Sequence, residues 1–113
     1  MQTIRFGVIG TGMISDRFAE AVKATPDCEI VSVYSRSEES GNTYARRHGI
    51  ESVCTSLDAL FASGIDAVYV ASPNLLHFSQ SMAALDAGLH VLCEKPAVPT
   101  VRQSLTRLSF VKL

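Results

Sequence analysis

The sequence predicts an α/β domain built on a doubly wound parallel sheet, the Rossmann architecture, with helices on both faces of the sheet and therefore three layers. Strand-like apolar runs alternate about five times with amphipathic helical segments along the 113 residues. The first apolar run also ends in closely spaced glycines followed by a helical pattern. Such a turn marks the point where the strand order reverses, so the predicted order is 3-2-1-4-5.

The first unit is a strand, a tight turn and a helix start. Apolar residues alternate with others over residues 4–9, and helical spacing begins at Met13. Between them, Gly10 and Gly12 open the pattern G-x-G-x-x-G, in which the first glycine makes the turn and the second lets a pyrophosphate approach the backbone. Ser15 replaces the third glycine and is small enough for close helix–strand packing. The helix N-terminus would bind the phosphates.

The second unit is a strand over residues 29–34, which are rich in β-branched side chains, and a helix over residues 39–48. Gly49 is expected to end this helix. The residues expected on its inner face are Tyr44, Ala45 and His48.

A very short third strand is expected at about residues 51–54. Thr55, with Asp58 three residues later, is typical of a helix N-cap, and Gly64 is expected to end that helix. The residues expected to point inward from it are Leu57, Leu60 and Phe61.

The fourth strand, residues 66–71, is continuously apolar, as is typical of the centre of a parallel sheet. A helix ending at Gly88 and a fifth strand over residues 89–93 follow. The apolar residues that mark this helix are Leu75, Phe78, Met82 and Leu85.

The segment after the fifth strand differs from the rest. Residues 1–96 are expected to form the dinucleotide-binding domain and residues 97–113 a short basic tail, because no acidic residue occurs from Lys95 onward. Two prolines interrupt this segment. The residues that can form one short helical face there are Val101, Leu105 and Leu108.

Composition excludes several classes. With 47% hydrophobic and 19% charged residues the chain is neither disordered nor membrane-spanning, and its N-terminus lacks the pattern of a secretory signal. A net charge of −1 gives no reason to expect nucleic acid. Cys28, Cys54 and Cys93 match no metal or redox spacing. We therefore expect reduced, mostly buried cysteines, no metal and a cytoplasmic location, with a reactive thiol at Cys93 as the alternative.

The end of the second strand indicates which dinucleotide fits. A site for NAD(H) would place an acidic residue there to bind the ribose 2′-hydroxyl. The chain instead has Ser35 and Arg36, and a hydroxyl with a guanidinium suits the 2′-phosphate of NADP(H). NADP(H) is therefore favoured. Glu38 and Glu39 keep NAD(H) possible, and ordinary solvated turn residues are the alternative reading.

Three motifs in order resemble the glucose–fructose oxidoreductase/inositol dehydrogenase (Gfo/Idh/MocA) family: residues 10–14, residues 71–74 with His77, and residues 88–96. The resemblance covers residues 1 to about 100 and implies hydride transfer between a nicotinamide cofactor and a sugar, polyol or related hydroxy compound. Lys95 would be the catalytic lysine at the substrate oxygen, where an ammonium can polarise a carbonyl. The cofactor-binding residues that the resemblance implies are Gly10, Thr11, Gly12, Met13, Ile14, Ser72, Asn74, His77 and Glu94.

Simpler roles remain open for several of these residues. Asn74 can cap the following helix in addition to any cofactor contact, and His77 and Lys95 can be ordinary exposed residues. His90 is expected to pack within the fifth strand. The bond between Lys95 and Pro96 is a candidate cis peptide.

The chain lacks the second α/β domain that the family resemblance implies, and with it most of a substrate pocket. We expect a truncated product, a frameshift after about Thr100 or a fragment, and therefore dinucleotide binding without turnover. The alternatives are a non-catalytic dinucleotide-binding or interaction module and a remnant that binds nothing. The outer edge of the fifth strand would be covered by the tail or would pair with a second copy in a homo-oligomer.

Overall fold

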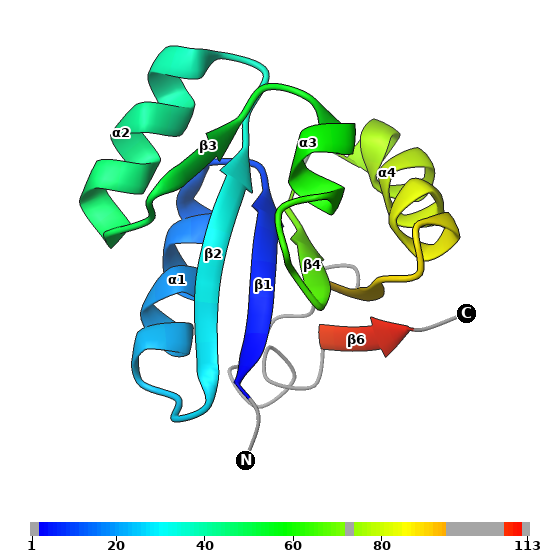
Figure 1. Ribbon diagram of the computed structural model, residues 1–113, viewed down its shortest axis with the longest axis horizontal. Helices are drawn as coiled ribbons and strands as arrows, with labels where there is room; N and C mark the ends of the chain where they lie inside the picture. The colour runs from blue at the N-terminus through cyan, green and yellow to red at the C-terminus, as the bar shows by residue number, and fades with distance from the viewer. Residues whose placement is uncertain (1–2, 72–73, 95–107, 112–113) are drawn as a thin grey trace.

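The computed structural model describes residues 3–71, 74–94 and 108–111, and for residues 74, 75, 77, 93, 94 and 108–111 it describes the backbone alone. Strands and helices alternate along the chain as predicted (Figure 1). The elements in chain order are β1 (Ile4–Ile9), α1 (Met13–Lys23), β2 (Cys28–Tyr34), α2 (Glu38–His48), β3 (Ser52–Cys54), α3 (Leu57–Phe61), β4 (Ala67–Val70), α4 (Asn74–Asp86), β5 (His90–Glu94) and β6 (Leu108–Val111).

The strands form one sheet in the order β3-β2-β1-β4-β5-β6. Neighbouring strands from β3 to β5 are parallel, which confirms the doubly wound Rossmann fold and its order 3-2-1-4-5. β1 lies at the centre, so the turn that follows it opens at the reversal of strand order.

β6 adds an antiparallel strand to the outer edge of β5, with Leu92 opposite Phe110. Of the two expected arrangements for this edge, coverage by the tail is therefore the one observed. Leu108 was expected on a helical face and lies instead in β6, because the backbone of β5 offers its residues a ladder of hydrogen bonds. Val101, Leu105 and the predicted boundary after residue 96 lie outside the described residues.

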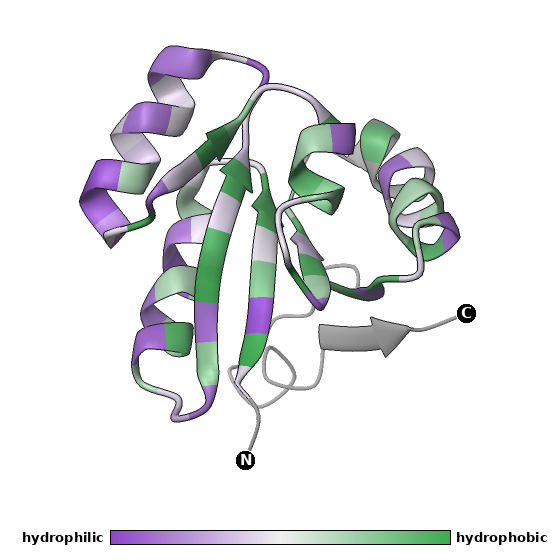
Figure 2. Ribbon diagram, in the orientation of Figure 1, coloured by the Kyte–Doolittle hydropathy of each residue, from purple (hydrophilic) through white to green (hydrophobic). Residues whose placement is uncertain are grey.

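One face of the sheet packs against α1 and α2 through aromatic side chains. The ring of Phe18 stacks on Tyr69 with 3.9 Å between centroids and meets Phe6 edge-on at 5.2 Å. Tyr44 is fully buried in the same core, with Ala45 beside it, as predicted. Its neighbours on α2 are mainly hydrophilic (Figure 2), as expected of a helix with one buried stripe.

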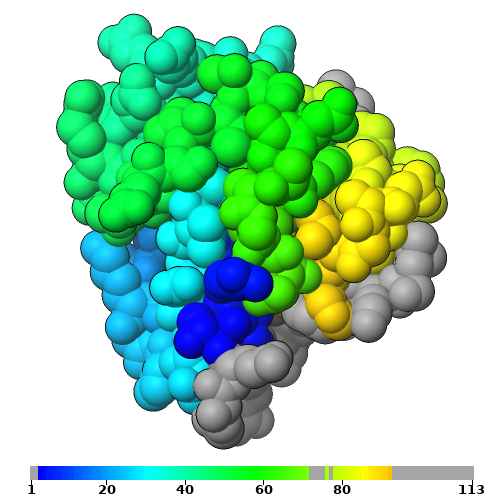
Figure 3. All heavy atoms as spheres, in the orientation of Figure 1, coloured from blue at the N-terminus to red at the C-terminus, as the bar shows by residue number. Residues whose placement is uncertain are grey.

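The opposite face packs against α3 and α4 through aliphatic side chains. Leu60 of α3 is completely buried there, and Leu57 and Phe61 are partly buried, as predicted. Figure 3 shows α3 and α4 as adjacent parts of the same side of the molecule. The buried residues of this core are Ile9, Cys54, Leu60, Ile65, Val68, Val70, Ala84, Leu85, Leu89 and Val91.

The helix marked by apolar residues before Gly88 is observed as α4, but not all of those residues face the sheet. Phe78 is 76% exposed and Met82 is 38% exposed, whereas Gln80, Ala84 and Leu85 are buried. Apolar residues occur all round this helix (Figure 2), so periodicity does not determine which side faces the sheet.

The cap predicted for α3 is displaced by one residue. Ser56, not Thr55, precedes the helix, and its hydroxyl accepts a hydrogen bond from the Ala59 amide at 3.1 Å. The two adjacent hydroxyl residues offer equivalent caps, and the end of β3 at Cys54 decides between them. α3 ends at Phe61, before Gly64, whereas α2 ends at His48 with Gly49 as its C-cap, as predicted.

Candidate dinucleotide-binding site

The turn between β1 and α1 is held by glycine geometry. Gly10 has a φ of 107°, which L side chains rarely adopt, so a glycine is needed there. Its amide donates to the carbonyl of Tyr34 at 3.2 Å and ties the turn to the end of β2.

The fold does not require the glycine at position 12. Its φ of −83° suits any residue, and a Cβ built on it would meet no protein atom within 4 Å. The position lines a cavity at the carboxyl ends of β1, β2 and β4. The missing side chain therefore leaves space for a molecule other than the protein.

Gly12 is also the N-cap of α1, and no side chain caps this helix. The first amide groups of a helix have no partner within the helix, and the helix dipole adds partial positive charge at the same place. The N-terminus of α1 therefore offers donors suited to phosphate oxygens.

Ser15, which stands where the glycine pattern has its third glycine, is fully buried as close packing predicts. Its hydroxyl donates to the carbonyl of Gly10 at 2.8 Å and so closes the turn onto the first turn of α1. This hydrogen bond was not predicted, because the sequence shows only that Ser15 is small.

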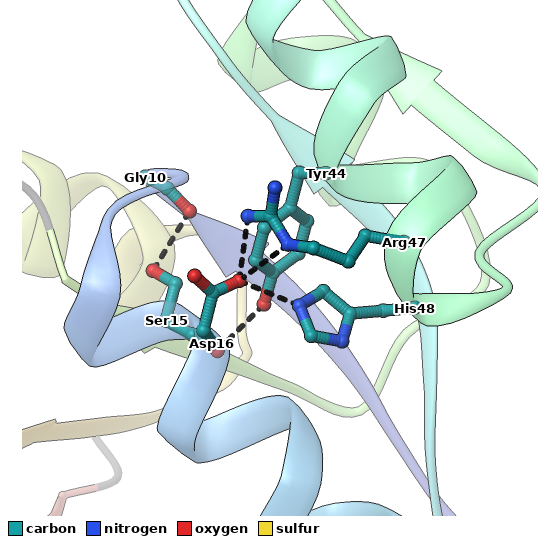
Figure 4. A network of polar contacts seen from close by, with 6 residues as sticks. All are labelled: Gly10, Ser15, Asp16, Tyr44, Arg47 and His48. Atoms are coloured by element: carbon teal, nitrogen blue, oxygen red, sulfur yellow. Dashed lines mark hydrogen bonds and ion pairs between the residues drawn. The ribbon is translucent and has the colours of Figure 1, made fainter.

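Tyr44 connects the turn to α2. Its hydroxyl donates to the carbonyl of Ser15 at 2.7 Å (Figure 4). Burial raises the pKa of Tyr44, and the charge of Asp16 adds to the effect, so the phenol stays a neutral donor.

Asp16 makes a second connection between α1 and α2. Its Oδ1 accepts from Arg47 Nη2 at 2.7 Å and Nε at 3.2 Å, and lies 2.6 Å from His48 Nε2 (Figure 4). Burial acts to raise the pKa of Asp16, but the hydrogen bonds and charges of His48 and Arg47 outweigh it and the pKa is lowered. Asp16 is 31 positions from Arg47 and 32 positions from His48, so no local sequence pattern predicts these contacts.

A cavity of about 650 Å³ opens at the carboxyl ends of β1, β2 and β4, where ligands of doubly wound sheets bind. Six of the predicted cofactor-binding residues line it: Gly10, Thr11, Gly12, Ile14, Ser35 and Arg36. The remaining lining residues, which the sequence did not single out as cofactor contacts, are Ile9, Tyr34, Ser37, Ser40, Ala71, Leu76 and Gln80.

The other residues predicted to bind the cofactor are not among the described residues that line this cavity. Met13 is 70% exposed and is absent from the lining of this cavity. Asn74 and His77 lie in the first turn of α4 and Glu94 ends β5, each described by its backbone alone. Ser72, Lys95 and the bond from Lys95 to Pro96 lie outside the described residues.

The turn after β2 is ordered by hydroxyl groups. Ser35 is buried, its Oγ lies 2.6 Å from Ser40 Oγ, and it accepts from the Ser37 amide at 3.3 Å. Ser37 in turn caps α2. Arg36 is exposed and makes no ion pair within the described part of the chain, so its guanidinium can bind an anion.

These features fit a dinucleotide: open space at Gly12, free amides at α1 and a cation with hydroxyls after β2. A sequence model of a family described as "Oxidoreductase family, NAD-binding Rossmann fold" (Gfo/Idh/MocA) matches residues 4–109. The chain belongs to this family.

Curated relatives are similar in sequence to most of this chain. The scyllo-inositol 2-dehydrogenase (NADP(+)) IolU of Bacillus subtilis is 40% identical over 110 residues, which are 96% of this chain and 34% of the relative. The 1,5-anhydro-D-fructose reductase of Ensifer adhaerens is 42% identical over 88% of this chain and 30% of its own length. The chain thus spans about a third of the curated relatives it matches.

Solved structures share the fold. The 3-ketoreductase KijD10 of Actinomadura kijaniata, in complex with NADP and TDP-benzene, superposes with a TM-score of 0.77 at 38% identity, covering 84% of this chain and 30% of KijD10. The WlbA dehydrogenase of Bordetella pertussis, in complex with NADH and UDP-GlcNAcA, gives 0.77 at 32% identity, covering 84% of this chain and 30% of that one.

Over the described residues, no group of three or more His, Cys, Asp or Glu could hold a metal ion. Nor is any helix in that part of the chain long and apolar enough to cross a bilayer.

Proposed function

We propose that this chain is the cofactor domain of an NADP(H)-preferring oxidoreductase that transfers hydride between nicotinamide and a sugar, polyol or related hydroxy compound. The observation that carries the proposal is the cavity at Gly12, where neither backbone geometry nor packing requires a glycine. Space is left there for a ligand, beside the uncapped start of α1.

The chain's own residues bind and orient the dinucleotide. The amides at the start of α1 hold the pyrophosphate, Gly10 and Ser15 fix the turn, and the space at Gly12 lets the phosphates reach the backbone. When bound, the nicotinamide supplies or accepts the hydride. The domain thus contributes orientation, and the electrostatics of Ser35 and Arg36 select the cofactor.

Preference for NADP(H) rests on the turn after β2. Ser35 and Arg36 line the cavity directly after Tyr34, so no carboxylate stands at the end of β2 to bind a 2′-hydroxyl. IolU is named as NADP(+)-dependent and KijD10 was solved with NADP, which supports the preference. NAD(H) remains an accepted second cofactor, in line with the NADH complex of WlbA.

Catalysis is assigned to residues at the ends of β4 and β5. Lys95 would polarise the substrate oxygen, with Ser72, Asn74, His77 and Glu94 around the nicotinamide half. The relatives are about three times as long as this chain, so a substrate pocket needs residues beyond it. We expect the 113-residue chain alone to bind cofactor without turnover.

The cytoplasm is the proposed location. Cys28 and Cys54 are free thiols, and reduced cysteines are typical of that compartment. Cys93, whose side chain is not described, lies near the end of β5.

Titration of the purified chain with NADPH and with NADH, followed by nicotinamide fluorescence, tests the proposal. NADPH should bind more tightly, and Arg36→Ala should weaken NADPH about tenfold or more with little effect on NADH, because one charge-assisted contact to the 2′-phosphate is lost. Arg17→Ala is the matched control, since Arg17 is exposed on α1 and absent from the cavity lining. Failure to bind either cofactor at millimolar concentration would reject the proposal.

A further inference from the structure

A second hollow of about 360 Å³ adjoins the dinucleotide cavity between the glycine turn and α2. The two spaces share Thr11, Ser37 and Ser40, so they are continuous along the turn after β2. The lining of the second hollow is rich in hydroxyl groups and contains one guanidinium: Thr11, Ser37, Glu39, Ser40, Thr43 and Arg47.

Arg47 reaches this hollow from the last turn of α2. Ser40, Thr43 and Arg47 are spaced three and four residues apart, so they fall on one side of the helix. The guanidinium carbon lies 5.7 Å from the ring centre of Tyr44. Asp16 fixes the guanidinium from α1 (Figure 4), and the Arg47 side chain remains 46% exposed.

The hydrogen bonds to Asp16 occupy Nε and Nη2 of Arg47. Because a guanidinium carries five N–H donors in a planar fork, donors at Nη1 remain for another anion. Arg47 is thus held in place by one carboxylate and still able to bind a second acceptor.

We propose that the 2′-phosphate of NADP(H) binds where the two spaces meet, between Arg36 and Arg47, so that Arg47 is a further specificity-determining residue. The inference rests on the proposed function. A phosphate offers several acceptor oxygens, and the junction supplies hydroxyl donors from Thr11 and Ser37 together with the two cations, whereas the Ser40 hydroxyl donates to the Ser37 carbonyl.

One carboxylate opposes this binding. Glu39 lines the same hollow, and its negative charge repels a phosphate. Asp16 does not line it, and its carboxylate is paired with Arg47 and His48. Arg47 and Glu39 therefore have opposite effects on affinity for NADPH and little effect on NADH, which has no phosphate at this position.

The test is fluorescence titration of the full chain and four variants with NADPH and NADH. Arg47→Gln should weaken NADPH about tenfold and change NADH by less than about twofold, and Glu39→Gln should tighten NADPH about threefold. Arg46→Gln, an equal charge change at an exposed neighbour on α2, should leave both affinities within about twofold. Asp16→Asn disrupts the same ion pair but keeps the guanidinium, so NADPH preference should fall by less than about threefold. Circular dichroism verifies that each variant is folded.

Several results would overturn the assignment of Arg47. Equal losses for NADPH and NADH in Arg47→Gln would mean a general effect on the turn, and equal losses in Arg47→Gln and Asp16→Asn would mean that only the ion pair matters. A chain that prefers NADPH regardless of Arg47 would reject this inference and leave the proposed function intact. A chain without any preference for NADPH would reject the proposed cofactor selection itself, with Arg47 included.

Discussion

The two faces of the sheet are packed in different ways. Against α1 and α2, Phe18 lies between the rings of Phe6 and Tyr69, and Tyr44 buries a hydroxyl that hydrogen-bonds across the two helices. Against α3 and α4, the core consists of aliphatic side chains with Cys54, and the largest fully buried side chain contributed by a helix is that of Leu60.

The difference matters because the glycine turn belongs to α1. Ring stacking and hydrogen bonds depend on direction, so they fix α1 at one height and rotation relative to the sheet. Aliphatic packing depends mainly on volume and tolerates rearrangement. The contacts of α1 therefore fix its position on the sheet more closely than aliphatic packing fixes the positions of α3 and α4.

The largest expected effect comes from truncating the centre of each core. Phe18→Ala should lower the free energy of unfolding by about 3–5 kcal/mol and Leu60→Ala by about 2–5 kcal/mol, because each leaves a cavity in place of a buried side chain. Urea unfolding followed by circular dichroism measures both.

Substitutions that keep an apolar side chain at each position sharpen this test. Phe18→Leu loses two ring contacts worth about 0.5–1.5 kcal/mol each beyond area burial, whereas Leu60→Met should cost less than about 1.5 kcal/mol. Equal costs for these two changes would show that the ring contacts of Phe18 add no stability of their own.

A smaller effect is expected where α2 holds the turn. Tyr44→Phe removes the hydrogen bond to the Ser15 carbonyl and should cost about 1–2 kcal/mol of unfolding free energy. Tyr34→Phe is the matched control, since the hydroxyl of Tyr34 makes no hydrogen bond within the described residues. Identical unfolding midpoints for the two variants would contradict a directional link between α1 and α2.

The smallest effect is expected on the outer side of α4. Phe78→Ser should change the unfolding free energy by no more than about 0.5 kcal/mol, because Phe78 is 76% exposed. Leu85→Ser, at a buried position of the same helix, should cost about 2 kcal/mol or more. A large loss at Phe78 would show that its side chain is buried, contrary to the structure.

Sequence reasoning succeeded where a pattern is local. The alternation of β1, the glycines at 10 and 12, and the inner face of α2 at Tyr44 and Ala45 all follow from short-range spacing. The orientation of α4 could not be predicted, because its apolar residues are distributed around the helix and define no preferred face.

The cofactor-binding roles of the candidate residues stay predictions, but motifs in the sequence did identify several residues that line one cavity. The residues of the glycine turn and Ser35 with Arg36 line the cavity, as expected from motifs that combine a strand end with a helix start. Leu76 and Gln80 enter the lining from α4, and Arg47 meets Asp16 across 31 positions. Such contacts depend on how helices pack, which no single stretch of sequence encodes.

Gly12 has a consequence for how this chain can change over evolutionary time. Selection for folding alone would accept a side chain at position 12, where a Cβ would meet no protein atom within 4 Å. It would reject a side chain at position 10, where φ is 107°. Selection for cofactor binding would reject both. A descendant that is no longer selected for cofactor binding should therefore lose the glycine at position 12 and keep the one at position 10. The residues at these two positions would then show whether selection for binding has continued.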